Sequence, residues 1–318
     1  MKSLKISIII PVFNAEKYLV KCLDSVLASL SEAGVEGEVL TVDNDSSDNS
    51  LSMLKEYATR ESGIIKILHC HTWGAAAVKN YGVSKARGEF MWFIDADDWI
   101  APSAVRRLVD RAEKTGADMV MMGAKRVYDE GGKSDGHKDY LAPISPDRPD
   151  YKSLFVRYGM GPWQVLIRRK WWVEHGFSFR EGIIHEDMEL MSSLILYTDK
   201  FAHVNAPLYF YRQTQESVLH RCVWDEHAYD IFPALEGLYA RFEEAEAIHV
   251  YYAELEWFFI WNLLIDSAKD FAQFPEGHGG FERSRLMLKK YFPRWWRNRF
   301  LRRKSLKFNA RVRANYLK

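Results

Sequence analysis

Short apolar runs alternate with segments of helical spacing over residues 5–122, and this alternation constrains the fold more than any other feature of the sequence. The first run, Lys5–Val12, is nearly continuous in β-branched residues, and apolar residues then recur at helical spacing over Tyr18–Leu30. Strands that alternate with helices predict an α/β fold with a parallel, doubly wound sheet. Further strands are expected at Glu38–Val42, Ile64–Leu68, Phe90–Ile94 and Met119–Met122. Further helices are expected at Ser50–Thr59 and Ala75–Lys85, and a third begins at Ala101–Ser103 and ends near Thr115.

The rest of the chain has a different character. Asp129–Asp150 is rich in Gly, Pro, Asp and Ser, which predicts a loop, and the chain after Trp224 is mainly helical in pattern, including the aromatic segment Tyr251–Ile265. We therefore predict a catalytic domain over residues 1–218 and a helical region over residues 219–318.

Three features bear on the compartment. Cys22, Cys70 and Cys222 lie far apart and form no C-x-x-C motif, which favours a reducing environment. The N-terminus shows no export signal. No window approaches the ~20 apolar residues that a membrane-spanning helix needs. The sequence thus predicts a cytoplasmic protein.

Polar segments follow three of the predicted strands. They are Phe13-Asn14, Asp43–Ser47 and Asp95–Asp98. Ligands of parallel sheets bind at the carboxyl ends of the strands, so these segments are expected to converge on one crevice.

The segment Asp95-Ala96-Asp97-Asp98 places three carboxylates within four residues. Carboxylates at this density repel one another unless a cation lies among them. Mg²⁺ and Mn²⁺ prefer such oxygen ligands and usually bridge to substrate phosphates. The alternative is a turn whose acids cap the next helix.

Other polar segments have two interpretations each. Asp43–Asp48 suits a nucleobase and ribose, or forms an Asx turn with a helix cap. Trp73–Asn80 opens a helix with small residues, which either approach the crevice or only pack tightly. In His185-Glu186-Asp187, the acids are either N-terminal helix charges or include a catalytic base.

In this order, the segments SIIIPVFN, VDNDSSDNS, GAAAVKN, GEFMWFIDADD, Gly161-Pro162-Trp163, HEDMEL and LYFYR resemble the family-2 glycosyltransferases. The resemblance covers roughly residues 3–217. It implies a GT-A fold, which is a Rossmann-like, mostly parallel sheet flanked by helices, and an enzyme that uses a divalent cation and inverts the anomeric centre.

The resemblance also implies roles for individual residues. Asp97, with Asp95, would bind the metal ion, and Asp187 would be the general base, oriented by Glu186. Trp163 and Gln164 would form the acceptor floor, supported by His185, although burial of Trp163 in the core is an equal alternative. The positions expected to bind the nucleotide sugar are Pro11, Phe13, Asn14, Asp43, Asn44, Asp45, Lys79, Asn80, Asp95, Ala96 and Asp97.

The chain departs from the family pattern at three of these positions. Asn44 replaces a second acid, Asp45 replaces a glycine, and Lys79 replaces an arginine. Asn still accepts a hydrogen bond from a pyrimidine N3–H, which favours a uridine donor without strictly excluding thymidine. Lys offers a point charge and not a planar fork, so it fixes no phosphate geometry.

The predicted activity is transfer of a hexose or N-acetylhexosamine from a UDP-sugar, with Mn²⁺ or Mg²⁺, to a glycan or lipid-linked acceptor in surface polysaccharide synthesis. A nucleotidyltransferase would need a Gly-rich basic loop where PVFNAEKY stands. A non-catalytic glycan-binding protein is the other alternative, against which the intact DADD and HED segments argue.

The tail Lys289–Lys318 holds 12 Lys or Arg and no acid, whereas the rest of the chain carries 32 basic and 43 acidic side chains. Its aromatic residues suit an interfacial helix, which predicts a peripheral protein on the anionic inner face of the membrane. A solvated basic face and nucleic-acid binding are the alternatives, and the enzyme assignment disfavours nucleic acid. The aromatic segment Tyr251–Ile265 could form an oligomer interface.

Overall fold

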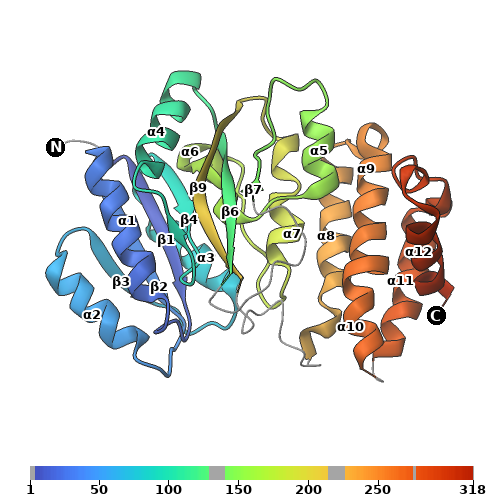
Figure 1. Cartoon of the computed structure of the whole chain (residues 1–318), viewed down its shortest axis with the longest axis horizontal. Helices are drawn as coiled ribbons and strands as arrows, with labels where there is room; N and C mark the ends of the chain where they lie inside the picture. Colours follow the sequence, from blue (N-terminus) through green and yellow to red (C-terminus); the bar gives the residue numbers. More distant parts are fainter. Residues whose placement is uncertain (1–3, 129–139, 214–225, 275–276, 318) are drawn as a thin grey trace. The chain divides into compact units, whose positions relative to one another are not determined.

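A computed structural model describes residues 4–128, 140–213, 226–274 and 277–317 (Figure 1). The chain forms two compact units. The sheet unit comprises Met1–Pro149, Gly161–Gly182 and Thr198–His220, and the helical unit comprises Asp150–Met160, Ile183–Tyr197 and Arg221–Lys318. Residues 129–139 of the predicted loop, Cys222 and Trp224 lie outside the described residues. The domain boundary at residue 218 stays a prediction.

The first half of the sheet follows the predicted alternation. Strands β1 (Ile6–Val12), β2 (Gly37–Asp43), β3 (Ile65–His69) and β4 (Phe90–Phe93) pair in parallel in the order β3-β2-β1-β4. The helices between them are α1 (Leu19–Ala33), α2 (Ser50–Arg60) and α3 (Ala75–Lys85). The predicted α/β fold is therefore confirmed.

The second half of the sheet is mixed in direction. Strand β8 (Val165–Arg168) pairs antiparallel with β4 and β6 (Met119–Tyr128), and β6 pairs in parallel with β9 (Phe201–Gln213). Two short strands, β5 (Trp99–Ile100) and β7 (Tyr140–Leu141), pair antiparallel with β9 and β6. The predicted strand Met119–Met122 is thus the start of a longer strand, while β5, β7, β8 and β9 were not predicted.

Helices cover both faces of the sheet. Ile6, Ile8 and Ile10 of β1 belong to one apolar core with residues of α1, α2 and α4 (Ala104–Thr115). Ile9 faces the other way, where a Cβ on Gly82 of α3 would come within 2.5 Å of its Cγ2 atom. Helix α6 (Arg169–Glu174) lies on this second face, since Trp172 contacts Phe93 with ring centroids 6.2 Å apart. Ala76 and Ala77, at the start of α3, are buried.

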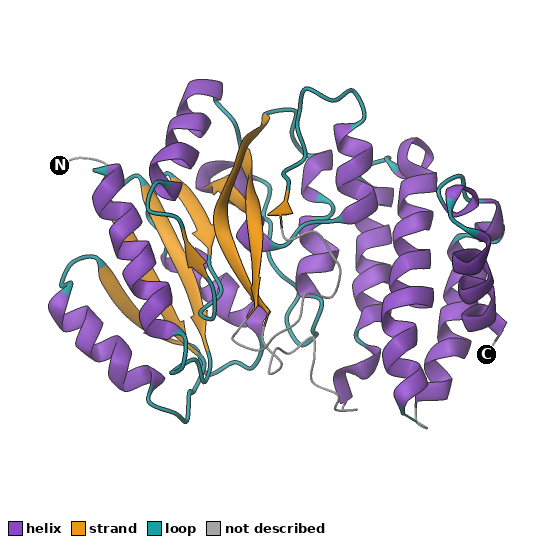
Figure 2. Ribbon diagram, in the orientation of Figure 1, coloured by secondary structure: helices purple, strands orange, loops and turns teal. Residues whose placement is uncertain are grey.

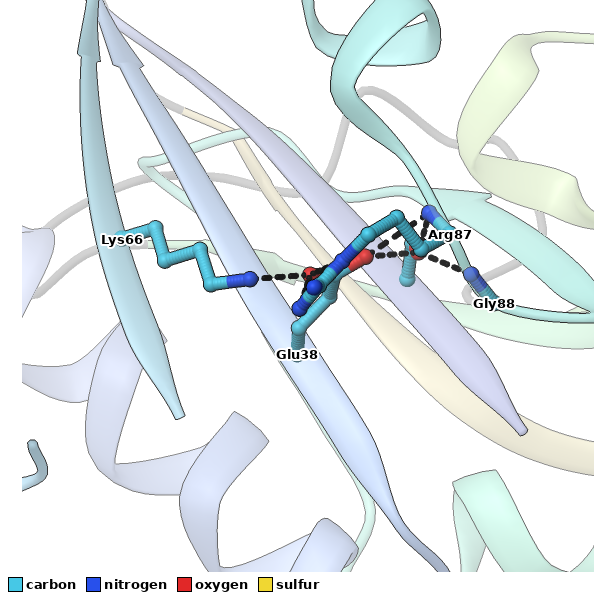
Figure 3. A network of polar contacts seen from close by, with 5 residues as sticks. Glu38, Lys66, Arg87 and Gly88 are labelled. Atoms are coloured by element: carbon cyan, nitrogen blue, oxygen red, sulfur yellow. Dashed lines mark hydrogen bonds and ion pairs between the residues drawn. The ribbon is translucent and has the colours of Figure 1, made fainter. Parts of the chain in front are cut away.

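A charged cluster lies on one face of the sheet near the amino-terminal ends of β1 and β2 (Figure 3). Glu38 is 1% exposed and forms an ion pair of 2.7 Å with Lys66 and one of 3.1 Å with Arg87. The Glu38 carboxylate also accepts hydrogen bonds from the Ser7 hydroxyl and the Arg87 backbone N–H. Burial raises the pKa of Glu38, but these partners outweigh burial and lower it overall.

The helical unit contains no strand among its described residues (Figure 2). Its longer helices are α5 (Tyr151–Tyr158), α8 (Ile231–Glu244), α9 (Ile248–Trp261) and α11 (His278–Tyr291). Helix α9 continues through a π-helical turn, Asn262–Asp266, into α10 (Ser267–Gln273), and the last helix is α12 (Leu306–Leu317). No helix in the described part of the chain has both the length and the apolar character that a membrane span requires.

The aromatic residues of the tail pack inside this unit. Phe292 lies with its ring centroid 4.9 Å from that of Phe259, and Trp295 lies 4.8 Å from Tyr316. Phe300 is also buried, whereas Trp296 is 47% exposed. The expectation that these aromatic residues form the apolar side of an interfacial helix is therefore wrong for most of them, because they complete a protein core. The basic side chains between them remain on the surface.

Candidate active site

The carboxyl ends of β1, β2 and β4 meet at one edge of the sheet unit. Val12 at the end of β1 is in register with Asp43 at the end of β2. The Ile94 N–H donates to the Ile9 carbonyl, which fixes the chain that leads into Asp95 beside β1. The three polar segments that follow these strands are thus brought together, as the sequence analysis expects.

Asp43 is a buried acid at this edge, with 2% of its surface exposed. Its Oδ1 atom accepts no hydrogen bond from any described residue, and its Oδ2 atom lies 3.8 Å from Nδ1 of His69. A buried acceptor without a partner is costly, and native proteins normally satisfy such groups with protein, water or ligand. The Oδ1 atom is therefore suited to accept a hydrogen bond from a ligand.

The side chain of Asn44 is oriented by the chain that follows β3. Its Nδ2 group donates to the carbonyls of Cys70, at 2.6 Å, and Thr72, at 3.0 Å. Because both partners are carbonyl oxygens, the amide cannot be turned round without opposing two acceptors. The Asn44 Oδ1 atom is left as an acceptor beside Asp43.

Two loop residues at this edge have left-handed backbones. Asn14 has φ of 49° and Asp45 has φ of 57°. Asn and Asp tolerate this conformation better than most residues, which explains how Asp45 replaces the glycine of the family pattern. The Asn14 Oδ1 atom accepts from the Ser47 N–H at 2.8 Å, so Asn14 joins the loops after β1 and β2. Asp45 instead contacts Nδ1 of His71 at 2.8 Å.

Apolar groups flank this edge as well. Pro11 is part of β1 and is partly buried, while Phe13 is 57% exposed immediately beyond the strand. An exposed aromatic ring next to unpartnered acceptors is a suitable surface on which a planar base can stack.

The two polar residues predicted on α3 lie in different surroundings. Lys79 is buried, with its Nζ atom 5.3 Å from the ring centroid of Phe179. The side-chain amide of Asn80 forms two hydrogen bonds with the backbone of Phe179. Its Nδ2 group donates to the Phe179 carbonyl at 2.8 Å, and its Oδ1 atom accepts from the Phe179 N–H at 2.9 Å. Asn80 thus holds the segment around Phe179 in place.

The acidic segment after β4 contains two kinds of carboxylate. Asp95 and Asp97 are partly exposed, and Ala96 between them is buried. Asp98 is 1% exposed and accepts hydrogen bonds from the Tyr209 hydroxyl, at 2.6 Å, and the Arg212 N–H, at 2.7 Å. Burial, with the charges of Asp95 and Asp97, raises the pKa of Asp98 to about 9. Asp98 is therefore a structural residue that anchors the segment.

The negative potential of this segment affects its neighbours. Burial, followed by the charges of the segment, raises the pKa of the Tyr211 hydroxyl to about 12. The same causes raise the pKa values of the Cys22 thiol and the Tyr209 hydroxyl well above their usual values. A site with this potential attracts cations. No cluster of three or more His, Cys, Asp or Glu with metal-binding geometry occurs in the described ranges.

Arg212 is a residue of this site that the sequence analysis did not single out. Its Nε–H donates to the Asp97 carbonyl at 2.8 Å, and its guanidinium carbon lies 4.7 Å from the Tyr18 ring and 4.9 Å from the Trp99 ring. Strand pairing of β9 with β5 brings Arg212 there. The only signal in the sequence was the LYFYR segment.

The predicted acceptor residues of the sheet unit are Trp163 and Gln164. The Trp163 ring is partly buried and stacks on Tyr209 and Tyr211, with centroid distances of 4.6 Å and 5.2 Å. Gln164 accepts from the Gly161 N–H at 2.7 Å, which closes the short helical turn Pro162–Gln164. Trp163 thus packs against the core while keeping part of its surface outside.

The segment His185-Glu186-Asp187 lies in the helical unit, where it opens α7 (Glu186–Met191). His185 has a left-handed backbone, with φ of 71°, which is uncommon for a residue other than glycine and often marks a functional turn. Glu186 is buried and Asp187 is partly exposed. The Asp187 Oδ1 atom accepts from the Met188 N–H at 2.8 Å, so the carboxylate is held at the start of the helix.

Asp230 fixes the chain just before this turn. Its Oδ2 atom accepts from the Ile184 N–H at 2.9 Å and lies 2.7 Å from Nδ1 of His227. The left-handed turn at His185 is thus supported from outside its own helix, which is the usual condition for a strained backbone to persist.

Comparison with known sequences decides the family. The model of glycosyl transferase family 2 matches residues 7–176, which is more than half of the chain and includes the strand-end segments described above. The chain belongs to glycosyl transferase family 2. The family resemblance of the motifs is thereby confirmed.

Named relatives of this family-2 chain occur in several bacteria. It is 29% identical over 268 residues to a putative glycosyltransferase, EpsH, of Bacillus subtilis, an alignment that covers 82% of this chain and 75% of the relative. It is 29% identical over 177 residues to the poly(ribitol-phosphate) beta-glucosyltransferase of Bacillus spizizenii, which covers 55% of this chain and 27% of the relative.

Solved structures confirm the GT-A type of fold for this family-2 member. Residues 1–349 of Staphylococcus aureus TarS, in complex with UDP-GlcNAc, superpose with a TM-score of 0.74 at 18% identity, and the match covers 98% of this chain and 89% of those 349 residues. A mannosyltransferase of Pyrobaculum calidifontis, in complex with GDP-Man and Mn²⁺, superposes with a TM-score of 0.54 at 15% identity, over 100% of this chain and 87% of that enzyme. At these identities the likeness concerns the fold alone.

Proposed function

We propose that this family-2 glycosyltransferase transfers a hexose or N-acetylhexosamine from a UDP-sugar to a glycan or lipid-linked acceptor, with inversion at the anomeric carbon. The observation that carries the proposal is the buried, unpartnered Oδ1 atom of Asp43 beside the Asn44 acceptor at the edge of a GT-A sheet. The reaction class follows from family membership, and the donor and acceptor are argued below.

The donor base binds between Phe13 and the acceptors of Asp43 and Asn44. A pyrimidine such as uracil presents an N3–H donor, which either acceptor can receive, and its ring can stack on an exposed aromatic side chain. Thymine has the same N3–H group, so this contact does not distinguish the two bases. The relative solved with UDP-GlcNAc favours uridine.

A divalent cation fits the segment that follows β4. Asp95 and Asp97 supply carboxylate oxygens, the ligand type that Mn²⁺ and Mg²⁺ prefer, and Asp98 is withdrawn into hydrogen bonds with Tyr209 and Arg212. Asp97 is proposed as the principal ligand, with Asp95 beside it. When bound, the cation neutralises charge on the departing diphosphate. The mannosyltransferase solved with Mn²⁺ is consistent with this choice of metal.

The proposed base is Asp187. It accepts the proton of the acceptor hydroxyl as that oxygen attacks the anomeric carbon, and Glu186 orients it. The residue is partly exposed at the start of α7, where its charge is also favoured by the helix dipole. One transfer step of this kind needs no covalent enzyme intermediate, because base and leaving group act on opposite faces of the sugar.

The acceptor is proposed to be a surface polymer or its lipid-linked precursor. Relatives named as poly(ribitol-phosphate) glycosyltransferases support a polymer acceptor. Trp163 would contact an acceptor sugar with the part of its ring that remains outside, with Gln164 and His185 in supporting positions. An enzyme that transfers sugar to a lipid-linked acceptor benefits from a peripheral position at the inner face of the membrane. The surface cations of the tail are suited to such a position, because the lipids there are anionic.

A donor screen tests the proposal. The full chain is offered UDP-, dTDP- and GDP-sugars with Mn²⁺, with Mg²⁺ and with a chelator, while release of the nucleoside diphosphate is measured. We expect UDP-sugars to be turned over only with the metal. Asp97→Ala is expected to weaken both metal and donor binding. Absence of turnover with every nucleotide sugar would favour a non-catalytic glycan-binding protein, and release of sugar 1-phosphate in place of the nucleoside diphosphate would favour a nucleotidyltransferase.

A further inference from the structure

The helical unit contains a pocket with aromatic walls, and the charged residues that line it are all cations. Its volume is about 170 Å³, and its lining residues come from the end of α5, from α9 and from the turn before α12; they are Arg157, Tyr158, Trp257, Phe300, Arg303 and Lys304. This is several times the ~30 Å³ that one water molecule occupies in the liquid, so a polyatomic group can enter. None of these residues belongs to the proposed transfer site.

Arg157 is the cation best fixed in this pocket. Its guanidinium carbon lies 4.4 Å from the Tyr158 ring centroid and 4.5 Å from that of Phe300, and the group donates to the Tyr158 hydroxyl at 2.8 Å. Its Nε–H is buried and has no hydrogen-bond partner among the described residues. A buried donor of this kind is normally satisfied by an acceptor, and the described residues supply none here.

The other two cations of the pocket are also uncompensated. Arg303 and Lys304 are exposed and form no ion pair with any acid in the described chain. Two acids of α9 precede Trp257, but both are buried and engaged: Glu254 with the Ser153 hydroxyl and with Arg299, and Glu256 with Asn298. The pocket thus concentrates positive charge without an internal counter-ion.

The turn that carries these cations is fixed by Asn298, which is 2% exposed. Its Nδ2 group donates to the Ala253 carbonyl of α9 at 2.7 Å. Its Oδ1 atom accepts from the N–H groups of Phe300, at 2.8 Å, and Leu301, at 3.2 Å. The pocket is therefore formed before any ligand arrives, which lowers the entropic cost of binding.

We propose that this pocket binds the phosphate group of an anionic membrane lipid. Three cations around one pocket, one of them an arginine held between two aromatic rings, suit phosphate oxygens. Large apolar side chains lie exposed next to these cations: Tyr158 is 65% exposed and Leu306, two residues after Lys304, is 89% exposed. Cations together with outward apolar groups suit the boundary between head groups and acyl chains better than they suit a soluble anion. The proposal identifies a lipid partner for the peripheral membrane position proposed above. It rests on that position and not on the proposed transfer chemistry.

Vesicle binding tests the proposal with a matched pair of variants. Arg303→Gln/Lys304→Gln removes two pocket cations, and Arg302→Gln/Lys307→Gln removes two exposed cations that do not line the pocket. The full chain and both variants are sedimented with phosphatidylcholine vesicles that contain or lack phosphatidylglycerol, after circular dichroism has verified their folds. We expect partitioning onto the anionic vesicles to fall at least about tenfold further for the pocket pair than for the control pair. Equal losses would assign binding to diffuse surface charge and overturn the pocket.

Soluble ligands separate the possible sources of phosphate. Binding of short-chain phosphatidylglycerol, below its micelle concentration, is followed by calorimetry beside inorganic phosphate and a single-stranded oligonucleotide. The lipid is expected to bind at least about tenfold more tightly than inorganic phosphate, and Arg157→Lys, which keeps the charge but loses the planar guanidinium, is expected to weaken binding of the lipid by about tenfold. Inorganic phosphate that binds as tightly, or an oligonucleotide that displaces the lipid, overturns the lipid assignment. Neither measurement uses a nucleotide sugar. A negative result would therefore overturn the lipid proposal without bearing on the proposed glycosyl transfer.

Discussion

The hydroxyl of Tyr209 donates a hydrogen bond of 2.6 Å to the buried carboxylate of Asp98 and accepts one of 3.2 Å from the Asp95 N–H. A residue of β9 thus holds both ends of the acidic segment that follows β4. The placement of the proposed metal ligands, Asp95 and Asp97, depends on a side chain from the other half of the sheet.

Replacing Tyr209 by Phe should destabilise this arrangement. The Asp98 carboxyl group would lose a buried partner, so we expect the free energy of unfolding to fall by about 1–3 kcal/mol. Urea denaturation of the variant and the wild type measures this loss. Tyr140→Phe is the control, because the Tyr140 hydroxyl bonds Asn205 on the surface and its removal should cost less than about 0.5 kcal/mol. A loss no larger than that of the control would contradict a structural role for Asp98.

Asp187→Asn should separate chemistry from binding. Loss of a placed base is expected to lower kcat by about 10²- to 10⁴-fold while donor affinity, measured by calorimetry, stays within about twofold. Glu243→Gln, an exposed acid on α8, serves as the control. If Asp187 is only a helix-terminal charge, kcat will match the control, and stability alone will fall by about 0.3–1 kcal/mol.

Asn44→Asp restores the acid that the family pattern has at this position, yet it should weaken donor binding. A carboxylate would face the carbonyls of Cys70 and Thr72, which now accept from the Asn44 amide. We expect about a tenfold rise in the Kd for UDP and a loss of about 1–2 kcal/mol in unfolding free energy. Asp45→Gly, at the neighbouring left-handed residue, is the control and should change stability by less than about 0.5 kcal/mol. Tighter UDP binding by Asn44→Asp would show that the amide orientation is not required.

The Glu38 cluster should make stability depend on pH. The pKa of Glu38 is lower in the folded protein than its usual value of 4.5, so its stabilisation is fully present above that value and is lost as pH falls through the folded pKa. Glu38→Gln should cost about 2 kcal/mol at pH 7, and the difference from wild type should shrink below about pH 4. Urea midpoints measured from pH 3 to pH 7 test this. The exposed Glu113→Gln should show no comparable trend, and a pH-independent Glu38→Gln effect would mean that its charge is not the cause.

The first four strands could be predicted because each is a short, almost continuous apolar run closed by a polar segment. Val165–Arg168 is only four residues long, and it is specified by pairing with strands far away in sequence, which local periodicity does not reveal. Phe201–Gln213 alternates apolar residues with His203, Asn205 and Pro207. This period of two is typical of a half-buried strand, so β9 could have been predicted.

The residues of the candidate site also fall into two groups, those that local sequence patterns predict and those that long-range contacts place. Asp43, Asn44 and Asp97 follow predicted strands and could be found from the sequence. The contribution of Arg212 depends on the pairing of β9 with β5, and the withdrawal of Asp98 depends on Tyr209, so neither could be inferred locally. The aromatic residues of the tail were assigned to a lipid surface because composition alone does not distinguish a protein core from a membrane as the place where aromatic rings are buried.

In the tail, residues that fill the core and residues that carry charge occupy separate positions of one segment. Phe300 and Leu301 are buried, while Arg302 and Arg303, directly after them, are exposed. Substitution at the exposed positions can change the electrostatics of this surface without repacking the interior. The net charge of this surface is therefore separable from the architecture, whereas loss of the chain from Phe292 onward would remove aromatic residues from the core of the helical unit.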